Sequence, residues 1–423
     1  MTVIGLDDTD SRERGMCTTY VAATLAHAVE AAGGTVERRL LVRLNPAVEH
    51  KTRGNAALAI HTDLDPARAL DLARERLDLA ETADPKTNPG VVVAPGAPGA
   101  VSDRVADFAR RAVRELLDID EAVALADEAG YEAAFAGNGR GRVGALAAVG
   151  AWRAFDDWTY ECISYREESR WGTPRDVDRE SVFAAADRGY PAVWDTVDHG
   201  EGYPVCVPRT PCPILHGIRG DDPDSVRQVA GEIDSEPVAR RALFVTNQGT
   251  DAHLQSVDGV EALREGGAFR VDGVVVGTPE TREGGHVFVE LQGDDGERVD
   301  CAAFEPTKRF RDRVRVLRAG DRVTVCGEVS GGTLKLEKFA VRELVTTERE
   351  NPDCPECGRS MGSAGAGQGY RCRDCGTHAD GKVEVPVERD LEVGWYEVPP
   401  CARRHIAKPL VRGGFDGTVH PER

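Results

Sequence analysis

The sequence contains no apolar run of the roughly 18 residues that a membrane-spanning helix needs. Its first residues, Met1 to Asp8, lack the basic and then apolar pattern of a secretory signal peptide. We therefore expect a cytoplasmic protein without a membrane partner. Aromatic residues are also few, at 6%, but hydrophobic residues reach 41%, which is typical of globular domains and excludes a disordered chain.

Lysine is nearly absent. Of the 53 basic residues, 7 are lysine and 46 are arginine, against 72 acidic residues, and the net charge is −19. Two explanations are open: a salt-rich cytoplasm, in which surplus charge keeps a protein soluble, and a codon bias towards arginine. The acidic total does not exclude a nucleic-acid partner, because local basic surfaces decide that interaction.

The 423 residues allow about two to four domains. Residues 1–265 alternate strand-like and helical patterns, with strands expected at Val3–Leu6 and Val36–Leu44 and a helix between them at Thr18–Ala32. Such alternation indicates layered α/β or α+β structure. We treat these residues as one catalytic region and predict a multidomain α+β protein.

Three further regions follow. Residues 268–346 carry about five short alternating strands, which predicts a small barrel of the oligonucleotide-binding (OB) type; a small β-sandwich is the alternative. Residues 350–380 hold a cysteine cluster. Residues 381–423 look irregular, and both a partner-binding tail and a C-terminal wrap remain open. No obligate protein partner is evident.

The cysteine cluster has the spacing C-x2-C-x14-C-x2-C, formed by Cys354, Cys357, Cys372 and Cys375. Two such C-x2-C turns present four thiolates to one tetrahedral Zn²⁺. Four thiolates leave no open coordination position, so we predict a structural zinc ribbon. The alternative is four free cysteines, since a disulfide framework is improbable in a chain without a signal peptide.

Three carboxylates follow the first expected strand, at Asp7, Asp8 and Asp10. Hard divalent cations prefer such oxygen ligands, and Mg²⁺ combines one or two carboxylates with substrate phosphates. The pattern indicates nucleotide–metal binding; an ordinary acidic turn is the alternative. Thr18 and Thr19 lie where the loop meets a helix, a position that favours a phosphate, although either could be a plain N-cap.

A second loop contains Gly139, Arg140, Gly141 and Gly144, which match G-x-G-x-x-G. We do not predict a dinucleotide-binding unit, because residues 131–136 do not resemble a strand. Closely spaced glycines and arginines can still cradle phosphate through backbone N–H groups. A flexible loop is the alternative.

These motifs, in this order, resemble those of the archaeal isoleucine-tRNA 2-agmatinylcytidine synthetase family, and the resemblance covers essentially the whole chain. The residues that carry it are the segments 5–11 (GLDDTDS), 15–20 (GMCTTY), 138–141 (NGRG), 158–161 (WTYE), 212–220 and 247–251 (NQGTD), the barrel and the four-cysteine ribbon. The low lysine content suggests a haloarchaeal member.

The resemblance implies an ATP-dependent ligase that joins agmatine to C2 of the wobble cytidine in the minor isoleucine tRNA. It implies a kinase-like domain, a ferredoxin-like domain, an OB barrel and a zinc ribbon. Asp7, Asp8 and Asp10 would hold Mg²⁺ and the ATP phosphates, and Thr18 matches the family's autophosphorylated threonine. Gly139, Arg140 and Gly141 would bind the nucleotide.

Two other classes of function compete with this hypothesis. A kinase-like enzyme acting on a small molecule would need the acidic loop but not the barrel and ribbon. A non-catalytic nucleic-acid-binding protein would need the barrel and ribbon but not the acidic loop. The sequence assigns no role to the loops at 211–220 and 247–253, and it does not identify the residues that bind agmatine.

Overall fold

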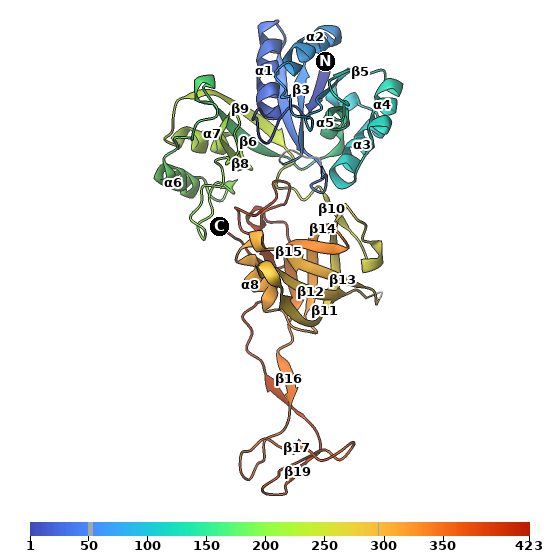
Figure 1. The fold of residues 1–423 in the computed structure, drawn as a ribbon, viewed down its shortest axis with the longest axis vertical. Coiled ribbons are helices and arrows are strands. Elements are labelled where there is room, and N and C mark those ends of the chain that lie inside the picture. The colour runs from blue at the N-terminus through green and yellow to red at the C-terminus, as the bar shows by residue number, and fades with distance from the viewer. Residues whose placement is uncertain (50–53, 295) are drawn as a thin grey trace.

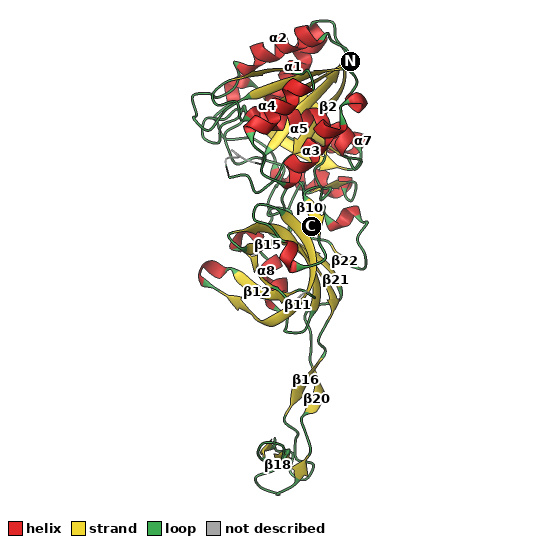
Figure 2. Ribbon diagram, turned by 90° about the vertical axis from the view of Figure 1, so that its right-hand side faces the viewer, coloured by secondary structure: helices red, strands yellow, loops and turns green. Residues whose placement is uncertain are grey.

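The computed structural model describes residues 1–49, 54–294 and 296–423. Three regions follow one another along the longest axis: a sheet covered by helices, a small β-barrel, and a thin stalk that ends in a ribbon (Figure 1, Figure 2). The C-terminus lies close to the junction of the first two regions (Figure 1). In the described part of the chain, no helix is long and apolar enough to cross a membrane.

A nine-stranded sheet forms the first region. Its strands are β1 (Thr2–Asp7), β2 (Val36–Arg43), β3 (Ala56–Thr62), β4 (Gly90–Pro95), β5 (Glu132–Phe135), β6 (Thr159–Arg166), β7 (Val193–Trp194), β8 (Ile214–Gly220) and β9 (Val238–Thr246). The spatial order is β5-β4-β1-β3-β2-β9-β6-β8-β7, and only β2 and β9 pair in parallel. This parallel pair joins two halves into one continuous sheet.

Seven helices of the described residues pack on this sheet. They are α1 (Thr18–Ala31), α2 (Pro66–Leu77), α3 (Asp103–Arg114), α4 (Ile119–Glu128), α5 (Gly141–Ala154), α6 (Arg179–Gly189) and α7 (Pro223–Glu232). In the amino-terminal half, α1 and α2 bury one face of the sheet, and α3, α4 and α5 bury the other. The second half runs β6-α6-β7-β8-α7-β9, with both helices packed on one face.

The barrel is a closed ring of five strands. They are β11 (Ala268–Thr281), β12 (Val287–Gln292), β13 (Arg298–Ala303), β14 (Arg322–Ser330) and β15 (Thr333–Glu343). The ring closes because β11 pairs with both β12 and β14, while β15 pairs with both β13 and β14. Helix α8 (Phe310–Arg315) lies between β13 and β14 in the sequence and buries Phe310 and Val314 in the barrel core.

The C-terminal segment adds to the barrel. Strand β10 (Leu254–Ser256) extends the barrel sheet beside β11, β21 (Gly394–Glu397) pairs with β15, and β22 (Val419–His420) pairs with β21. Between β21 and β22 the chain passes back to the large sheet, where the backbone N–H groups of Gly249 and Thr250 donate to the carbonyls of His405 and Ile406. Residues 387–423, which follow the stalk, therefore wrap the barrel and contact the sheet.

The stalk is a two-stranded ladder of β16 (Thr347–Glu350) and β20 (Val383–Pro386). It carries the ribbon away from the barrel (Figure 1, Figure 2). The ribbon contains three short strands, β17 (Gly362–Ser363), β18 (Tyr370–Arg371) and β19 (His378–Ala379). Its small core consists of Met361, Cys354 and Cys372, with Tyr370 and Ala379 packed against them.

The predicted elements are confirmed at β1, α1 and β2, but the prediction that residues 131–136 lack a strand is wrong. β5 is an edge strand that pairs only with β4 and is largely exposed, so its sequence shows no apolar alternation. The Gly-rich loop does follow a strand and precede a helix. Within the described residues it is still not part of a parallel β-α-β unit, because β6, the strand after α5, lies far from β5 in the sheet.

Candidate functional site

A cavity of about 1190 Å³ lies where the large sheet meets the barrel. One wall contains Asp7, Asp8, Asp10 and Thr18, from the end of β1 and the start of α1. The opposite side includes barrel residues such as Glu328 and Lys335, together with the C-terminal segment. The structure thus places the acidic loop, Thr18 and the barrel around one space.

Asp8 and Arg140 form the contact between the acidic loop and the Gly-rich loop. The Arg140 Nη2 atom donates to Asp8 Oδ2 and to the Lys86 carbonyl, both at 2.7 Å. The backbone N–H of Asn88 also donates to Asp8 Oδ2, at 3.2 Å, while Asn88 Oδ1 accepts from the N–H of Asn138 at 3.0 Å. Asn88 therefore connects the two loops, a role for which the sequence contains no recognisable signal.

Asp7 lies against the first turns of α5. A Cβ atom on Gly144 would lie 2.0 Å from Asp7 Oδ2, and one on Gly141 would lie 2.7 Å from the Asp7 carbonyl. Only glycine permits this approach. Burial, and then the neighbouring carboxylate of Asp8, raise the pKa of Asp7 well above its usual value. A carboxylate in this state fits a cation, which would favour its charged form.

Thr18 is the first residue of α1 and is 5% exposed. Its hydroxyl accepts a hydrogen bond from the Thr9 hydroxyl at 3.2 Å. The N-cap of α1 is Cys17, whose side chain makes no capping hydrogen bond. Neither threonine is therefore the N-cap, and the start of α1 retains N–H groups that favour a negative charge.

Beside the cavity, a chain of polar side chains links four segments that are distant in the sequence. Gln248, after β9, donates from Nε2 to Glu161 Oε2 at 2.5 Å and accepts from Arg43 at 3.3 Å. Arg43 also donates to His405 Nδ1 at 3.0 Å. Desolvation, followed by the charges of Arg43 and Arg219, holds the pKa of His405 well below its usual value. The 247–253 loop thus contacts Arg43 and Glu161, which line the cavity, although Arg43 and His405 carry no sequence signal of their own.

The four cysteines of the ribbon meet as predicted. The Sγ atoms of Cys354, Cys357, Cys372 and Cys375 all lie within 4.8 Å of one another. The Sγ atoms of Cys357 and Cys372 are 3.6 Å apart, close to the ~3.8 Å that a tetrahedral site with Zn–S bonds of ~2.3 Å requires. The donor set therefore fits structural zinc.

One other described group gathers three potential metal ligands within 4.8 Å, namely Asp251, His253 and Glu337. Lys338 Nζ already binds both carboxylate oxygens of Asp251, at 2.8 and 2.7 Å, and His253 Nε2 contacts Glu337 at 3.1 Å. The ion pair of Lys338 with Asp251 and the contact of His253 with Glu337 join the segment after β9 to the barrel. Asp7, Asp8 and Asp10 do not form a group as compact as this one.

Three family models match the chain: "TiaS TCKD domain" over residues 3–67, "TiaS FLD domain" over 139–253 and "TiaS C-terminal zinc ribbon domain" over 351–391. The chain is 55% identical to TiaS of Haloquadratum walsbyi, the 2-agmatinylcytidine synthetase of the second isoleucine tRNA, and 46% identical to TiaS of Methanosarcina acetivorans. In each case 100% of both chains is covered.

Solved structures of TiaS proteins have the same fold as this chain. Apo TiaS, an agmatidine synthetase for the same isoleucine tRNA, has a TM-score of 0.89 at 43% identity, covering 100% of both chains. A complex of TiaS with this tRNA and ATP, and one with this tRNA, AMPCPP and agmatine, have TM-scores of 0.88 and 0.87 at 42% and 40% identity, covering 100% of this chain and 99% of theirs. This chain therefore belongs to the TiaS family of isoleucine-tRNA 2-agmatinylcytidine synthetases.

Proposed function

We propose that this protein is an ATP-dependent ligase that joins agmatine to C2 of the wobble cytidine in the minor isoleucine tRNA, the tRNA that reads AUA. The relatives crystallised with this tRNA, a nucleotide and agmatine support the proposal over the whole chain. The observation in this structure that carries it is the cavity, which combines an acidic wall bearing Thr18 with a wall built from the barrel.

The ATP site in this proposal lies at the end of β1. Asp7, Asp8 and Asp10 would hold Mg²⁺, which supplies charge stabilisation for the phosphates when bound. Gly139, Arg140 and Gly141 would contact the phosphates, because the Gly-rich loop and the first turn of α5 lie directly beside Asp7 and Asp8. Thr18 would accept a phosphoryl group at the start of α1, where a dianion is favoured.

The chemistry requires a better leaving group at C2 of cytosine. Transfer of the γ-phosphoryl group from ATP to the C2 oxygen releases ADP and weakens the C2–O bond. The primary amine of agmatine then attacks C2, loses its proton, and the oxygen leaves as inorganic phosphate. Activation by AMP, with pyrophosphate released, would serve the same end. Acidic side chains around the cavity, among them Glu161 and Glu328, suit the cationic guanidinium of agmatine.

The architecture supports a nucleic-acid substrate. The five-stranded ring β11-β12-β13-β15-β14, with α8 between β13 and β14, has the connectivity of an OB barrel. The unit β6-α6-β7-β8-α7-β9, with order β9-β6-β8-β7, supports the assignment of a ferredoxin-like domain to this part of the chain. We infer that the amino-terminal half of the sheet is the kinase-like part, that the barrel and ribbon hold the tRNA, and that the enzyme works in the cytoplasm.

The direct test is to incubate the protein with ATP, MgCl₂, agmatine and tRNA at high salt, and to digest the tRNA for nucleoside mass spectrometry. We expect an agmatine-modified cytidine that needs all four components, and release of ADP rather than AMP on the phosphoryl route.

Asp8→Ala should abolish the product and retain the fold. Phosphopeptide mapping after incubation with ATP should place phosphate on Thr18. Absence of the modified nucleoside would refute the ligase function and favour a kinase of small molecules or a non-catalytic binder.

A further inference from the structure

One segment of the cavity wall depends on hydrogen bonds from other parts of the chain for its conformation. Residues 208–213 (Pro-Arg-Thr-Pro-Cys-Pro), here called the proline loop, form neither helix nor strand, and Pro208, Arg209, Thr210 and Cys212 line the cavity. Its three prolines have no N–H groups, so the loop lacks half of the backbone donors that could bond its carbonyls. Carbonyl groups need partners when they are not hydrated, and these must come from outside the loop.

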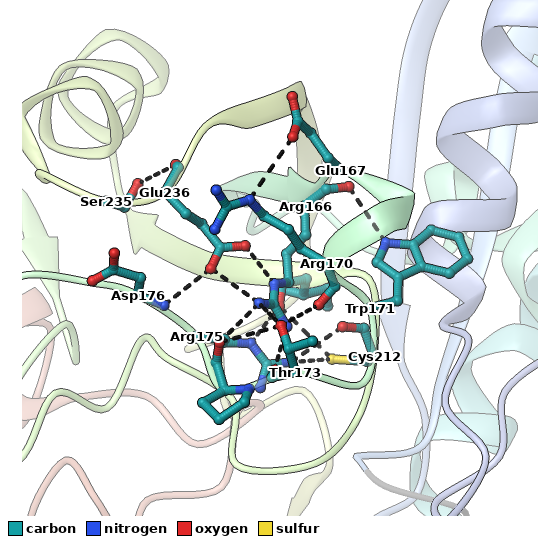
Figure 3. A network of polar contacts seen from close by, with 12 residues as sticks. Arg166, Glu167, Arg170, Trp171, Thr173, Arg175, Asp176, Cys212, Ser235 and Glu236 are labelled. Atoms are coloured by element: carbon teal, nitrogen blue, oxygen red, sulfur yellow. Dashed lines mark hydrogen bonds and ion pairs between the residues drawn. The ribbon is translucent and has the colours of Figure 1, made fainter.

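Arg175 supplies these partners. Its Nε donates to the Ile214 carbonyl at 2.8 Å and its Nη1 to the Pro208 carbonyl at 2.8 Å. Its Nη2 lies 3.0 Å from the Thr210 carbonyl, 3.2 Å from the Cys212 carbonyl and 3.1 Å from Cys212 Sγ. One planar guanidinium thus binds four carbonyls between residues 208 and 214. Figure 3 shows its contact with Cys212.

A buried ion pair, Arg166 with Glu236, holds the backbone on both sides of Arg175. Arg166 and Glu236 are 2% and 0% exposed and form two contacts, at 2.6 and 3.0 Å. The remaining Arg166 N–H groups donate to the carbonyls of Thr173 and Pro174, at 2.8 and 3.0 Å, and Glu236 accepts from the N–H of Asp176 at 3.0 Å. The residues on both sides of Arg175 are therefore held by the same pair (Figure 3).

The other side of the proline loop meets the acidic loop. A Cβ atom on Gly15 would lie 3.4 Å from the Pro211 carbonyl and 4.0 Å from the Cys212 Cα atom, and Gly15 has a φ of +99° that other residues rarely adopt. The backbones of the two loops thus lie close together just before Thr18. Movement of the proline loop would change this contact and the width of the cavity.

We propose that Arg175 is a positioning residue for the reaction: through the proline loop it fixes the cavity wall that faces the acidic loop and Thr18. The inference rests on the proposed function, because it assumes that the reacting groups meet in this cavity. Misplacement of reacting groups by ~1 Å can cost ~100-fold in rate. Asp8 and Arg140 are held by separate contacts, so ATP binding should be little affected.

The test compares Arg175→Met with the wild-type full-length enzyme. We expect kcat for agmatine conjugation to fall at least ~10-fold, while the KM for ATP changes less than about twofold. Arg175→Lys should recover only a minor part of kcat, because an ammonium group cannot reproduce the planar set of donors. Hydrogen exchange of the ligand-free variant should be faster at Arg209, Thr210 and Cys212.

Arg170→Met is the matched control. Arg170 belongs to the same turn, but its side chain is 42% exposed and pairs only loosely with Glu167, at 3.8 Å. This variant should keep the wild-type kcat. The number of ATP molecules bound per chain measures the folded fraction. Unchanged kcat in Arg175→Met, or a loss that parallels the folded fraction, would overturn the inference. If the wild-type enzyme also forms no product, the proposed function fails. Hydrogen exchange at the proline loop then still shows whether Arg175 holds this loop in place.

Discussion

At the residue scale, the carboxyl group of Asp7 destabilises the ligand-free protein when it ionises. Its pKa is raised by burial and by Asp8, so the folded state favours the protonated form. The stability that this group contributes is present below the usual aspartate pKa and is lost as the pH rises through the raised pKa. The ligand-free fold therefore disfavours the ionised form of Asp7, and a bound cation would favour it.

We predict that Asp7→Asn raises the Tm of the ligand-free protein near pH 8 and lowers the ligase activity at least ~100-fold. The asparagine oxygen can still accept the 2.7 Å hydrogen bond from the N–H of Asp8. The gain in Tm should shrink as the pH falls towards ~3.9, the usual pKa of aspartate. Thermal unfolding across this pH range is the measurement.

Asp84→Asn is the control for this prediction. Hydrogen bonds from the Ser11 hydroxyl and the Lys86 N–H lower the pKa of Asp84, the opposite direction to Asp7. Its substitution should not raise the Tm. Equal gains in both variants would mean that removal of any negative charge stabilises this acidic protein, and would contradict the specific role of Asp7.

At the element scale, the contact between β1 and α5 sets the geometry of the acidic loop. A Cβ atom on Gly5 would lie 2.1 Å from the Ala145 carbonyl. Helix α5 cannot move away from β1, because it also packs closely on α3: a Cβ atom on Gly150 would lie 2.4 Å from the Val105 carbonyl. α5 is thus wedged between the sheet and α3 with backbone contacts on both sides.

We expect Gly5→Ala to destabilise the protein by about 1–3 kcal/mol, the usual cost of overpacking a core, and to weaken ATP binding by shifting α5. Gly99→Ala provides the comparison, because no heavy atom lies within 4 Å of its Cβ position. That variant should stay within about 0.5 kcal/mol of wild type. Urea unfolding measures both effects, and equal stabilities would show that α5 can move freely.

Elements with a regular apolar pattern could be predicted from the sequence, and elements held by distant neighbours could not. α1 carries Val21, Leu25 and Val29 on one buried face, so its position followed from its own residues. All four residues of β21 are buried, so they show no alternation, and only its pairing with β15 explains the strand. A local pattern contains no information about such a partner.

The same distinction applies to the candidate site. Asp8 and Arg140 are 132 positions apart, yet both belong to local motifs with recognisable chemistry, and the structure brings them into contact. Asn88 contacts the Gly-rich loop, and Arg43 contacts Gln248, each through a single side chain that belongs to no motif. Their roles depend on how β2, β4 and β9 are placed in the sheet, which one sequence does not show.

At the scale of the whole molecule, buried ion pairs join the large sheet to the barrel. Arg403 is 2% exposed; it pairs with Asp195, which follows β7, and with Glu397 of β21 at 2.8 Å. Both carboxylates are as deeply buried as the arginine. Loss of the guanidinium would remove a buried partner from both carboxylates and would leave Asp195 with Arg219 at 3.8 Å. Removing one member of a buried ion pair is strongly destabilising.

We predict that Arg403→Met costs about 3–5 kcal/mol and separates the calorimetric unfolding of the sheet from that of the barrel. Arg423→Met is the control at the same junction, because the ion pair of Arg423 with Asp187 is 42% and 51% exposed. Its effect should be at most about 1 kcal/mol. A single, unshifted transition in Arg403→Met would show that other contacts alone couple the two regions.

The stalk sets the range over which the ribbon can act. Every residue of β16 is exposed, and β20 has only one half-buried position, so this strand pair has no core to resist bending. The ribbon therefore lies at the far end of the molecule from the cavity, joined to the barrel through this strand pair (Figure 1). A tRNA that is held by both the ribbon and the barrel, as proposed above, is bound at two linked sites, and its overall affinity then exceeds that of either site alone.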